Sequence, residues 1–463
     1  MKLSIILFLL LFSITPGQAQ TPLDAYLKKA LEQNIGVRQQ ELSLEQSEAD
    51  LKIARQQFLP TLSVNARYSV AAGGRSFIIP VGDLVNPIYA NLNALNDVAE
   101  AAAPDYPTLS DYPAINNVEE NFLRPTEQET VVRLQMPVFN QAIVHNQRIQ
   151  ENILAAGQLS VEAYKRTLVK EVKVAYYSYL QARKGAQIVQ NARALLEENL
   201  RTTQSLETHH KVTRDAVYRA QAELSAVAQQ LTEARKQEKV ARALFNTLLN
   251  RPLDAAIEAP TTSALLPGPA FTLQDAQAQA LRQREEFDQL SCYEAVRSQE
   301  LAIAKGNRLP TVNLQADYGI QGTRYEIDDN ARFFLGSVVM NVPIFDAKNN
   351  TRTQKARIGQ LQMEQQRAAA KQQVQLQVLQ AYYELEAAKE QIEQSKAAYA
   401  AAEQGFRLIR KKYEQGQANL LEFQQSRNQM TTAALQQSIA QLQYQVRHAN
   451  LEQATATYPI GSF

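Results

Sequence analysis

The adjacent histidines His209 and His210 are the closest that this sequence comes to a reactive or metal-binding pair. Two imidazoles ligate a transition metal stably only when further ligands join them in one compact site. Because the pair falls in the polar break at 208–214, we interpret both histidines as solvated side chains and predict no metal site. The single cysteine, Cys292, cannot form an internal disulfide, and we interpret it as a small residue on a helix face.

The sequence lacks the residue patterns of the common enzyme classes. It offers no nucleophile paired with a base, no glycine-rich phosphate loop and no metal-ligand cluster. These observations argue against an enzyme and predict no cofactor. The net charge is +1, from 48 basic and 47 acidic residues without a basic block, so nucleic acid is not an expected partner.

The chain is a tandem repeat, and the repeat decides which elements position its side chains. The stretch ARQQFLPTLSVNARY at 54–68 recurs in type and spacing as AKGNRLPTVNLQADY at 304–318, at an offset of 250 residues. The stretch VVRLQMPVFN at 131–140 recurs at 337–346 at an offset of 206. The fall from 250 to 206 predicts a 44-residue excess in the first copy, within about 76–127.

Each copy is predicted to run helix, strand, loop, strand, very long helix, turn, helix. We assign residues 20–250 to the first structural repeat, 251–270 to a connector, 271–454 to the second repeat and 455–463 to a C-terminal tail. The insertion at 76–127 is rich in proline, asparagine and tyrosine, so we interpret it as an elaborated loop with a short helix near 92–103.

Four stretches alternate between apolar and polar residues with the period of a β-strand. In 61–70 and 311–320 the apolar positions are Leu62, Val64, Ala66, Tyr68 and Val70, and Val312, Leu314, Ala316, Tyr318 and Ile320. In the returning strands they are Val132, Leu134, Met136 and Val138, and Val338, Met340, Val342 and Ile344. About ten residues with one apolar face suit a tilted membrane strand. The alternative is an ordinary half-buried hairpin of a soluble domain.

The lengths of the proline-free stretches predict a set of parallel rods. Stretches of about 68 and 70 residues follow Phe139 and Phe345, and each would form a rod of about 100 Å. Shorter helices are predicted over four ranges, 22–57, 214–250, 272–307 and 418–454, so that two placed end to end match one long helix. A seam with coiled-coil spacing supports side-by-side packing: Leu168, Val172, Ala175, Tyr179, Ala182, Ala186 and Val189. A single long intramolecular coiled coil is the alternative.

The first 19 residues carry the pattern of an export signal. One lysine precedes an apolar core, and Gly17 and Ala19 stand before the predicted cleavage site. The residue directly after that site is Gln20 and not a cysteine, so lipid attachment there is not expected. No later stretch approaches 18 consecutive apolar residues, so no membrane helix is predicted in the mature chain. The mean hydropathy of the full sequence is −0.35.

The repeated motifs resemble the TolC-like outer membrane efflux proteins. The motifs are a Leu-Pro pair before each first strand, MPVF or VPIF before each long helix, and the turn YEQGQANLLEF at 413–423. The resemblance covers essentially the whole mature chain. It implies a mostly α-helical fold with a membrane β-barrel: a homotrimer whose chains each give four strands to one twelve-stranded barrel, continuous with a long α-helical coiled-coil barrel. An equatorial belt would gather the connector and the chain ends.

The resemblance also implies a gate at the periplasmic tip. Tyr413 falls on the family's tip tyrosine and Gly416 on its turn glycine, whereas Ala418 stands where well-studied members have an arginine. Glu422 falls on an aspartate of the narrowest ring, and Gln425 replaces the second acidic residue. With one acidic residue per chain at these two positions, the narrowest ring of a trimer would carry three carboxylates instead of six.

In the first copy, the corresponding turn offers different candidates. Asp215 lies within one residue of a gate position, and Arg214 is a candidate replacement cation. For the second copy there are plainer alternatives, in which Tyr413 simply packs at a helix end and Glu422 is an exposed helix carboxylate. In that case neither residue would belong to a gate.

The implied function is a passive exit duct of a tripartite efflux or type I secretion system. Substrate would pass from an inner-membrane pump, through a channel opened by a periplasmic adaptor, to the exterior. The protein would sit in the lipid of a Gram-negative type outer membrane, with its helices in the periplasm. The alternative is a periplasmic coiled-coil scaffold or adaptor without a pore, which explains the helices but leaves four alternating strands without a purpose.

Overall fold

The chain folds as two compact units, each described here by itself. The computed structural model describes residues 22–103, 107, 110–259 and 271–460. The helical unit consists of the described residues up to Ala54, His145–Ala304 and those from Asn350 onward; the strand unit consists of Arg55–Val144 and Lys305–Asn349. The predicted export signal, residues 260–270 of the connector and the last three residues of the tail lie outside the described residues.

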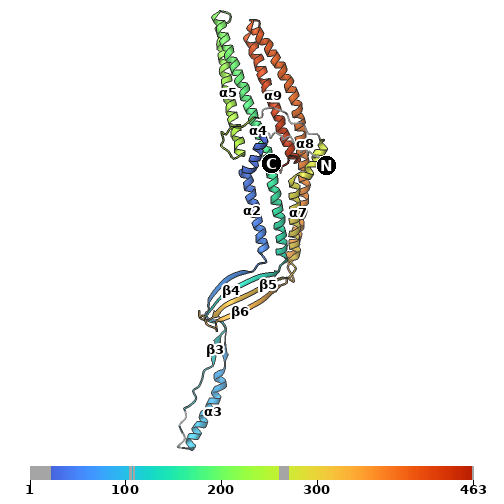
Figure 1. Cartoon of the computed structure of the whole chain (residues 1–463). Coiled ribbons are helices and arrows are strands. Elements are labelled where there is room, and N and C mark those ends of the chain that lie inside the picture. Colours follow the sequence, from blue (N-terminus) through green and yellow to red (C-terminus); the bar gives the residue numbers. More distant parts are fainter. Residues whose placement is uncertain (1–21, 104–106, 108–109, 260–270, 461–463) are drawn as a thin grey trace, which may run out of the picture. The chain divides into compact units, whose positions relative to one another are not determined.

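The helical unit is built from helices of very unequal length (Figure 1). The bounds are α1 Pro22–Gln33, α2 Ile35–Gln56, α4 Gln141–Thr208, α5 Arg214–Leu248, α6 Leu273–Gln283, α7 Glu285–Gly306, α8 Ala347–Glu414 and α9 Leu420–Thr455. Helices α4 and α8 contain 68 residues each, which confirms the two rods of about 100 Å. None of the helices among the described residues is both long enough and apolar enough to cross a membrane.

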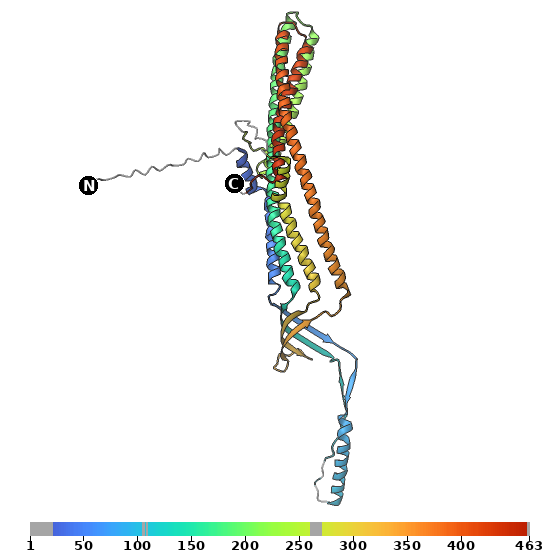
Figure 2. The ribbon, with the colours of Figure 1, turned by 90° about the vertical axis from the view of Figure 1, so that its right-hand side faces the viewer.

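Short helices follow one another along each long one, as the lengths predicted. Figure 1 shows α5 and α2 along α4, and Figure 2 shows α7 beside α8. The end of α5 meets the first-copy short helices at the middle of α4, where Phe245 packs with Leu27, Val37 and Val172. All four side chains are almost completely buried. At this junction the short helices pack end to end against α4.

The two copies repeat the same seam. The predicted seam of α4 is buried except at Ala182, which is only partly covered. At the offset of 206, Leu168, Val172 and Ala175 correspond to Val374, Val378 and Ala381, which are buried in the core of the second copy. The coiled-coil spacing therefore indicates the true packing face in both rods.

Two predicted helices are wrong in one respect, because each is broken. The helix expected over 22–57 is interrupted at Asn34, and the one expected over 272–307 at Arg284. These positions are equivalent at the offset of 250. Neither break occurs at a proline, the usual sequence signal for the end of a helix. The apolar periodicity on either side gave no sign of the breaks.

Polar side chains account for both breaks. Asn34 Oδ1 accepts a hydrogen bond of 2.8 Å from the backbone N–H of Gly36 and so caps α2. Its amide nitrogen also donates to the carbonyl of Leu248, at 2.8 Å. In the second copy Arg284 is buried and donates to Gln377 Oε1 of α8, at 2.7 Å. The backbone N–H groups of Asn34 and Arg284 still bond to the carbonyls of Ala30 and Ala280, and their side chains add contacts to other helices at the breaks.

The connector and the tail both reach the middle of α4, where the resemblance placed an equatorial belt. Tyr176 Oη donates to the carbonyl of Glu258 at 3.0 Å, and the backbone N–H of Glu258 donates to Tyr26 Oη at 2.9 Å. Arg166 Nη1 donates to the carbonyl of Tyr458, at 2.8 Å. Both segments are therefore anchored on the first long helix.

The strand unit holds an antiparallel sheet of four strands in the order β1-β4-β5-β6. The bounds are β1 Thr61–Val70, β4 Thr126–Phe139, β5 Thr311–Gly322 and β6 Arg332–Asn341. The second returning strand begins earlier than predicted and ends before Val342 and Ile344. By contrast, β4 continues past Pro137, with an irregularity in register between Pro137 and Phe139.

One face of the sheet is apolar across all four strands. The pairing places Val64 opposite Val132, Val132 opposite Tyr318, and Tyr318 opposite Phe334. These side chains are exposed in the single chain. The predicted alternation is therefore confirmed, because the register collects the even-numbered apolar residues on the same face.

The opposite face carries polar and charged side chains. Arg133 donates two hydrogen bonds to the carboxylate of Asp317, of 2.8 and 3.0 Å, and Gln315 donates to the same carboxylate at 2.9 Å. Arg67 pairs with Glu129 at 3.1 Å. The sheet thus separates an apolar side from a charged one.

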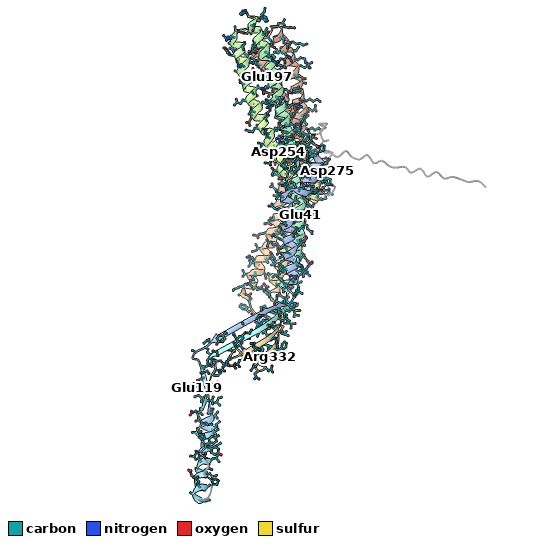
Figure 3. The ribbon with its side chains drawn as sticks, turned by 60° about the vertical axis from the view of Figure 1, so that its left-hand side comes forward. Glu41, Glu119, Glu197, Asp254, Asp275 and Arg332 are labelled. Carbon is teal, nitrogen blue, oxygen red and sulfur yellow. The ribbon has the colours of Figure 1, made fainter. Side chains whose placement is uncertain are left out.

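The insertion contains more structure than the predicted loop. A second, two-stranded sheet pairs β2 Ser76–Ile79 with β3 Val118–Asn121, and Ser76 Oγ donates to the carboxylate of Glu119, labelled in Figure 3. Between them lies α3, Val81–Ala102, a helix of 22 residues where the sequence predicted only a short one near 92–103. Pro87 lies within α3, in a part of the helix that sequence reasoning had assigned to loop.

Candidate functional site: the two hairpin turns

The α4–α5 and α8–α9 turns have the same backbone design. After α4, His210 adopts the left-handed conformation with φ 53°, and after α8 Gly416 does so with φ 71°. In the first turn the N–H of Lys211 bonds to the carbonyl of Leu206, at 2.8 Å, and the second turn repeats this bond five residues apart, at 2.7 Å. These are the bonds of a glycine-type helix end, although the first copy makes it with a histidine.

Glu422 lies in the first turn of α9 and takes part in its cap. Asn419 Oδ1 accepts a 2.9 Å hydrogen bond from the N–H of Glu422, while Asn419 Nδ2 donates to the Glu422 carboxylate at 3.1 Å. A carboxylate at a helix N-terminus also interacts favourably with the helix dipole. Glu422 and Gln425 are both exposed, and Gln425 borders a groove that Glu223 and Asn428 also line.

Tyr413 is buried between the two copies. Its ring packs on Phe423 with 4.9 Å between centroids, and Phe406 completes the aromatic cluster. Its hydroxyl lies 3.4 Å from Thr203 Oγ1 of α4, and the Thr203 hydroxyl in turn donates to the carbonyl of Asn199 at 2.9 Å. Tyr413 therefore packs at the end of α8, and the same contacts tie this helix end to α4.

Arg214 and Asp215 have local partners. Asp215 accepts a hydrogen bond from Thr213 Oγ1 and pairs with Arg219 at 3.5 Å. The hydrogen bond from Thr213 and the charge of Arg219 lower the pKa of the Asp215 carboxyl. The Arg214 guanidinium lies 6.0 Å from the Tyr218 ring centroid. Within the described residues, no hydrogen bond or ion pair links this arginine and aspartate to the second-copy turn.

Two charged contacts between the α4–α5 and α8–α9 hairpins were missed by sequence reasoning. Arg427 of α9, whose side chain is 2% exposed, pairs with Glu223 of α5. Arg410 of α8 reaches Glu198 of α4 at 3.4 Å. Arg427 follows Phe423 by four residues and precedes Met430 by three, so an arginine at a seam position was the available signal.

The described residues contain no group of three or more His, Cys, Asp or Glu side chains placed to hold a metal ion. The two turns instead combine helix caps, an aromatic cluster and ion pairs between hairpins. Such an arrangement can hold two hairpin ends together or release them. It offers no nucleophile with an adjacent base.

The fold matches solved outer membrane channels over nearly the whole chain. The CmeC outer membrane channel of Campylobacter jejuni aligns with a TM-score of 0.73 and 14% identity, covering 94% of this chain and 85% of that one. VceC of Vibrio cholerae aligns with 0.70 and 14%, covering 94% and 95%. The Neisseria gonorrhoeae MtrE channel, solved in an open state, aligns with 0.70 and 17%, covering 94% and 89%.

These likenesses establish the fold of a TolC-like channel, a class whose members assemble as trimers. By sequence, residues 276–457 match the family model described as outer membrane efflux protein. The matched segment covers less than half of the chain, and over the rest the similarity to these outer membrane channels is one of fold. A comparison with curated proteins found no match.

Proposed function

We propose that three copies of this chain form the outer-membrane exit duct of a tripartite efflux or type I secretion system. Each chain contributes its four-stranded sheet to one twelve-stranded barrel, and the helical units form the periplasmic tunnel. A periplasmic adaptor and an inner-membrane pump supply substrate and energy. The first 19 residues act as a cleaved export signal, and the protein carries no lipid anchor.

The exposed apolar face of the sheet is the observation that carries this proposal. Strands of 10 to 14 residues match the length of tilted membrane strands. The edge strands of this sheet are β1 and β6, and open edges do not occur in lipid. Joining β6 of one chain to β1 of the next satisfies both edges and turns the charged face, with Arg133 and Asp317, toward a lumen.

The two hairpin turns act as the gate of the duct. Tyr413 and Gly416 shape the second-copy tip, and Arg214 and Asp215 form the first-copy tip. Glu422 places three carboxylates around the narrowest ring of the trimer, while Gln425 adds none. Because Ala418 supplies no cation, closure depends on packing and on contacts such as the one between Tyr413 and Thr203.

Membrane extraction and conductance test the proposal together. The protein is expected in the outer-membrane fraction, extractable only by detergent, with the mass of a trimer, and conducting in planar bilayers. A matched pair of variants tests the sheet: Val64→Arg places a charge on the apolar face, and Asn65→Arg places it on the polar face. Only Val64→Arg is expected to reduce assembly. A lipid-facing arginine near the bilayer midplane lowers the free energy of barrel stabilisation by about 2–4 kcal/mol.

The scaffold alternative makes the opposite prediction. A pore-free periplasmic coiled coil would be water-soluble, and Val64→Arg would affect it no more than Asn65→Arg. A water-soluble monomer would therefore refute the exit duct. So would a detergent-extracted trimer that conducts no ions under any condition that opens related channels.

A further inference from the structure

Helix α3 of the insertion carries an apolar stripe that nothing covers in the single chain. The stripe positions follow one another at steps of four and three residues, the spacing of a coiled-coil seam: Leu84, Ile88, Asn91, Leu95, Val98 and Ala102. Leu84, Leu95 and Val98 are 68%, 66% and 64% exposed. Large apolar side chains aligned this way on one helix face mark an interaction surface.

The opposite face of α3 is already occupied by the chain that returns toward β3. The Asn86 side chain exchanges two hydrogen bonds of 2.9 Å with the backbone of Ile115. Asn93, two turns further, does the same with Tyr112, at 3.1 and 2.9 Å. These bonds fix the rotation of the helix, because the two asparagines hold one face against the return segment and turn the stripe outward.

The charge of the insertion argues against a lipid surface as the occupant of the stripe. Residues 76–123 contain seven acidic residues and no Lys or Arg. Helices that lie on membranes are typically rich in Lys and Arg on their polar face, and an anionic lipid surface repels carboxylates. On α3 the acidic residues are Asp83, Asp97 and Glu100, none of which occupies a stripe position.

We propose that the stripes of three α3 helices, one from each chain, pack together into a parallel three-helix bundle at the mouth of the duct. This inference rests on the trimeric assembly of the proposed function. Both strand connections of the sheet, from β1 to β4 and from β5 to β6, leave from its same end. Threefold symmetry then brings three copies of α3 to one mouth, where each stripe meets an identical stripe.

Tethering lets a helix of this length associate. An isolated coiled coil of 22 residues is marginal in water, but strands fixed in one barrel hold the three helices at a high effective concentration. Asn91 lies in the middle of the stripe, and a single core asparagine fixes the register of such a bundle at some cost in stability. The bundle would thus be specific and not strongly stable.

Cysteine cross-linking in the full-length protein tests the bundle. In a Cys292→Ser background, Leu95→Cys places a thiol on the stripe, and Ala90→Cys places one on an exposed position of the same helix outside the stripe. Mild oxidation of the detergent-extracted protein should join two subunits per trimer through position 95. The yield of disulfide-linked dimer should exceed that of Ala90→Cys at least tenfold.

Two further measurements keep the outcomes distinct. The mass of each variant is measured without oxidation; a parent protein that is not a trimer would refute the proposed function itself. A trimer with no preferential cross-linking at position 95 would refute only the bundle. A fluorophore on Leu95→Cys is also tested in vesicles with nitroxide-labelled lipids: quenching by lipid would show that the stripe lies on the membrane and overturn the proposal.

Discussion

Removal of the Glu223 carboxylate should loosen the contact between the two hairpins of one chain. Arg427 is 2% exposed, so without its partner its charge remains buried and uncompensated. Breaking a buried ion pair by removing one partner typically costs 3–5 kcal/mol. Because Glu223 retains 16% exposure, we expect the lower end, about 3 kcal/mol, for Glu223→Leu. This corresponds to a roughly 100-fold increase in the opening constant of the contact between α5 and α9.

Amide hydrogen exchange measures this opening directly. Amides in the first turns of α9, from Leu420 to Met430, should exchange roughly 100-fold faster in Glu223→Leu when exchange is limited by local opening. Glu233→Leu is the matched control, since Glu233 lies on the same helix in an exposed pair with Lys236. No measurable change is expected there, because exposed ion pairs contribute little.

A double variant separates charge from shape. Glu223→Leu combined with Arg427→Met removes both charges and keeps apolar volume, so exchange should return close to the parent rate. If Glu223→Leu leaves the exchange of α9 unchanged, the ion pair does not hold the hairpins together. If the double variant is as fast as Glu223→Leu, the effect comes from altered packing and the electrostatic reasoning is wrong.

Three further predictions address the turns and the middle of α4. Glu422→Gln should weaken cation selectivity and block by divalent cations in planar bilayers, and unchanged block would remove Glu422 from the narrowest ring. His210→Gly should stabilise the first turn by about 1 kcal/mol, and Gly416→Ala should destabilise the second by about the same amount, because only glycine adopts the left-handed conformation without strain; exchange of the turn amides measures both. Burial would raise the pKa of Glu452, but the neighbouring His448 side chain, 3.5 Å away, and the charge of Lys173 hold that pKa below the ordinary 4.5. The stability contributed by Glu452 is therefore present above that pH and lost as the pH falls through its lowered pKa, and thermal melts against pH should lose this acid dependence in Glu452→Gln.

The features that sequence predicted best are those encoded by local periodicity. The seam of α4 and the even-numbered apolar face of the sheet follow from residue spacing alone, so both were found without any partner. Tyr413 was found through the resemblance, and its burial against Phe423 explains why an aromatic residue ends α8. The site residues' roles in gating stay predictions.

The features that sequence missed depend on single tertiary contacts. The break at Asn34 requires the carbonyl of Leu248, which lies 214 residues away along the chain. The full length of α3 was hidden because Pro87 and the asparagines read as loop, whereas Asn86 and Asn93 bond to the return segment. His210 at a left-handed position was missed because glycine is the usual signal for that conformation.

The internal duplication creates a pairing problem that apolar packing alone does not solve. The seams of the two copies match position by position, so a helix could in principle pack on the wrong copy. Within the part of the chain that the structure describes, three ion pairs with largely buried side chains link the first copy to the second: Arg166 with Glu285, Lys173 with Glu452, and Glu223 with Arg427.

None of these charges is repeated. At the offset of 206, the residues equivalent to Arg166, Lys173 and Glu223 are Gln372, Leu379 and Gln429. Their partners Glu285, Glu452 and Arg427 likewise lack charged counterparts in the first copy. The equivalent residues there are Ile35, at the offset of 250, and Asn246 and Gln221, at the offset of 206. A helix packed on the wrong copy would bury these charges without partners, at a cost of several kcal/mol each. The apolar repeat therefore makes two similar rods, and the unrepeated charges favour the observed pairing of α4 with α7 and α9 and of α5 with α9.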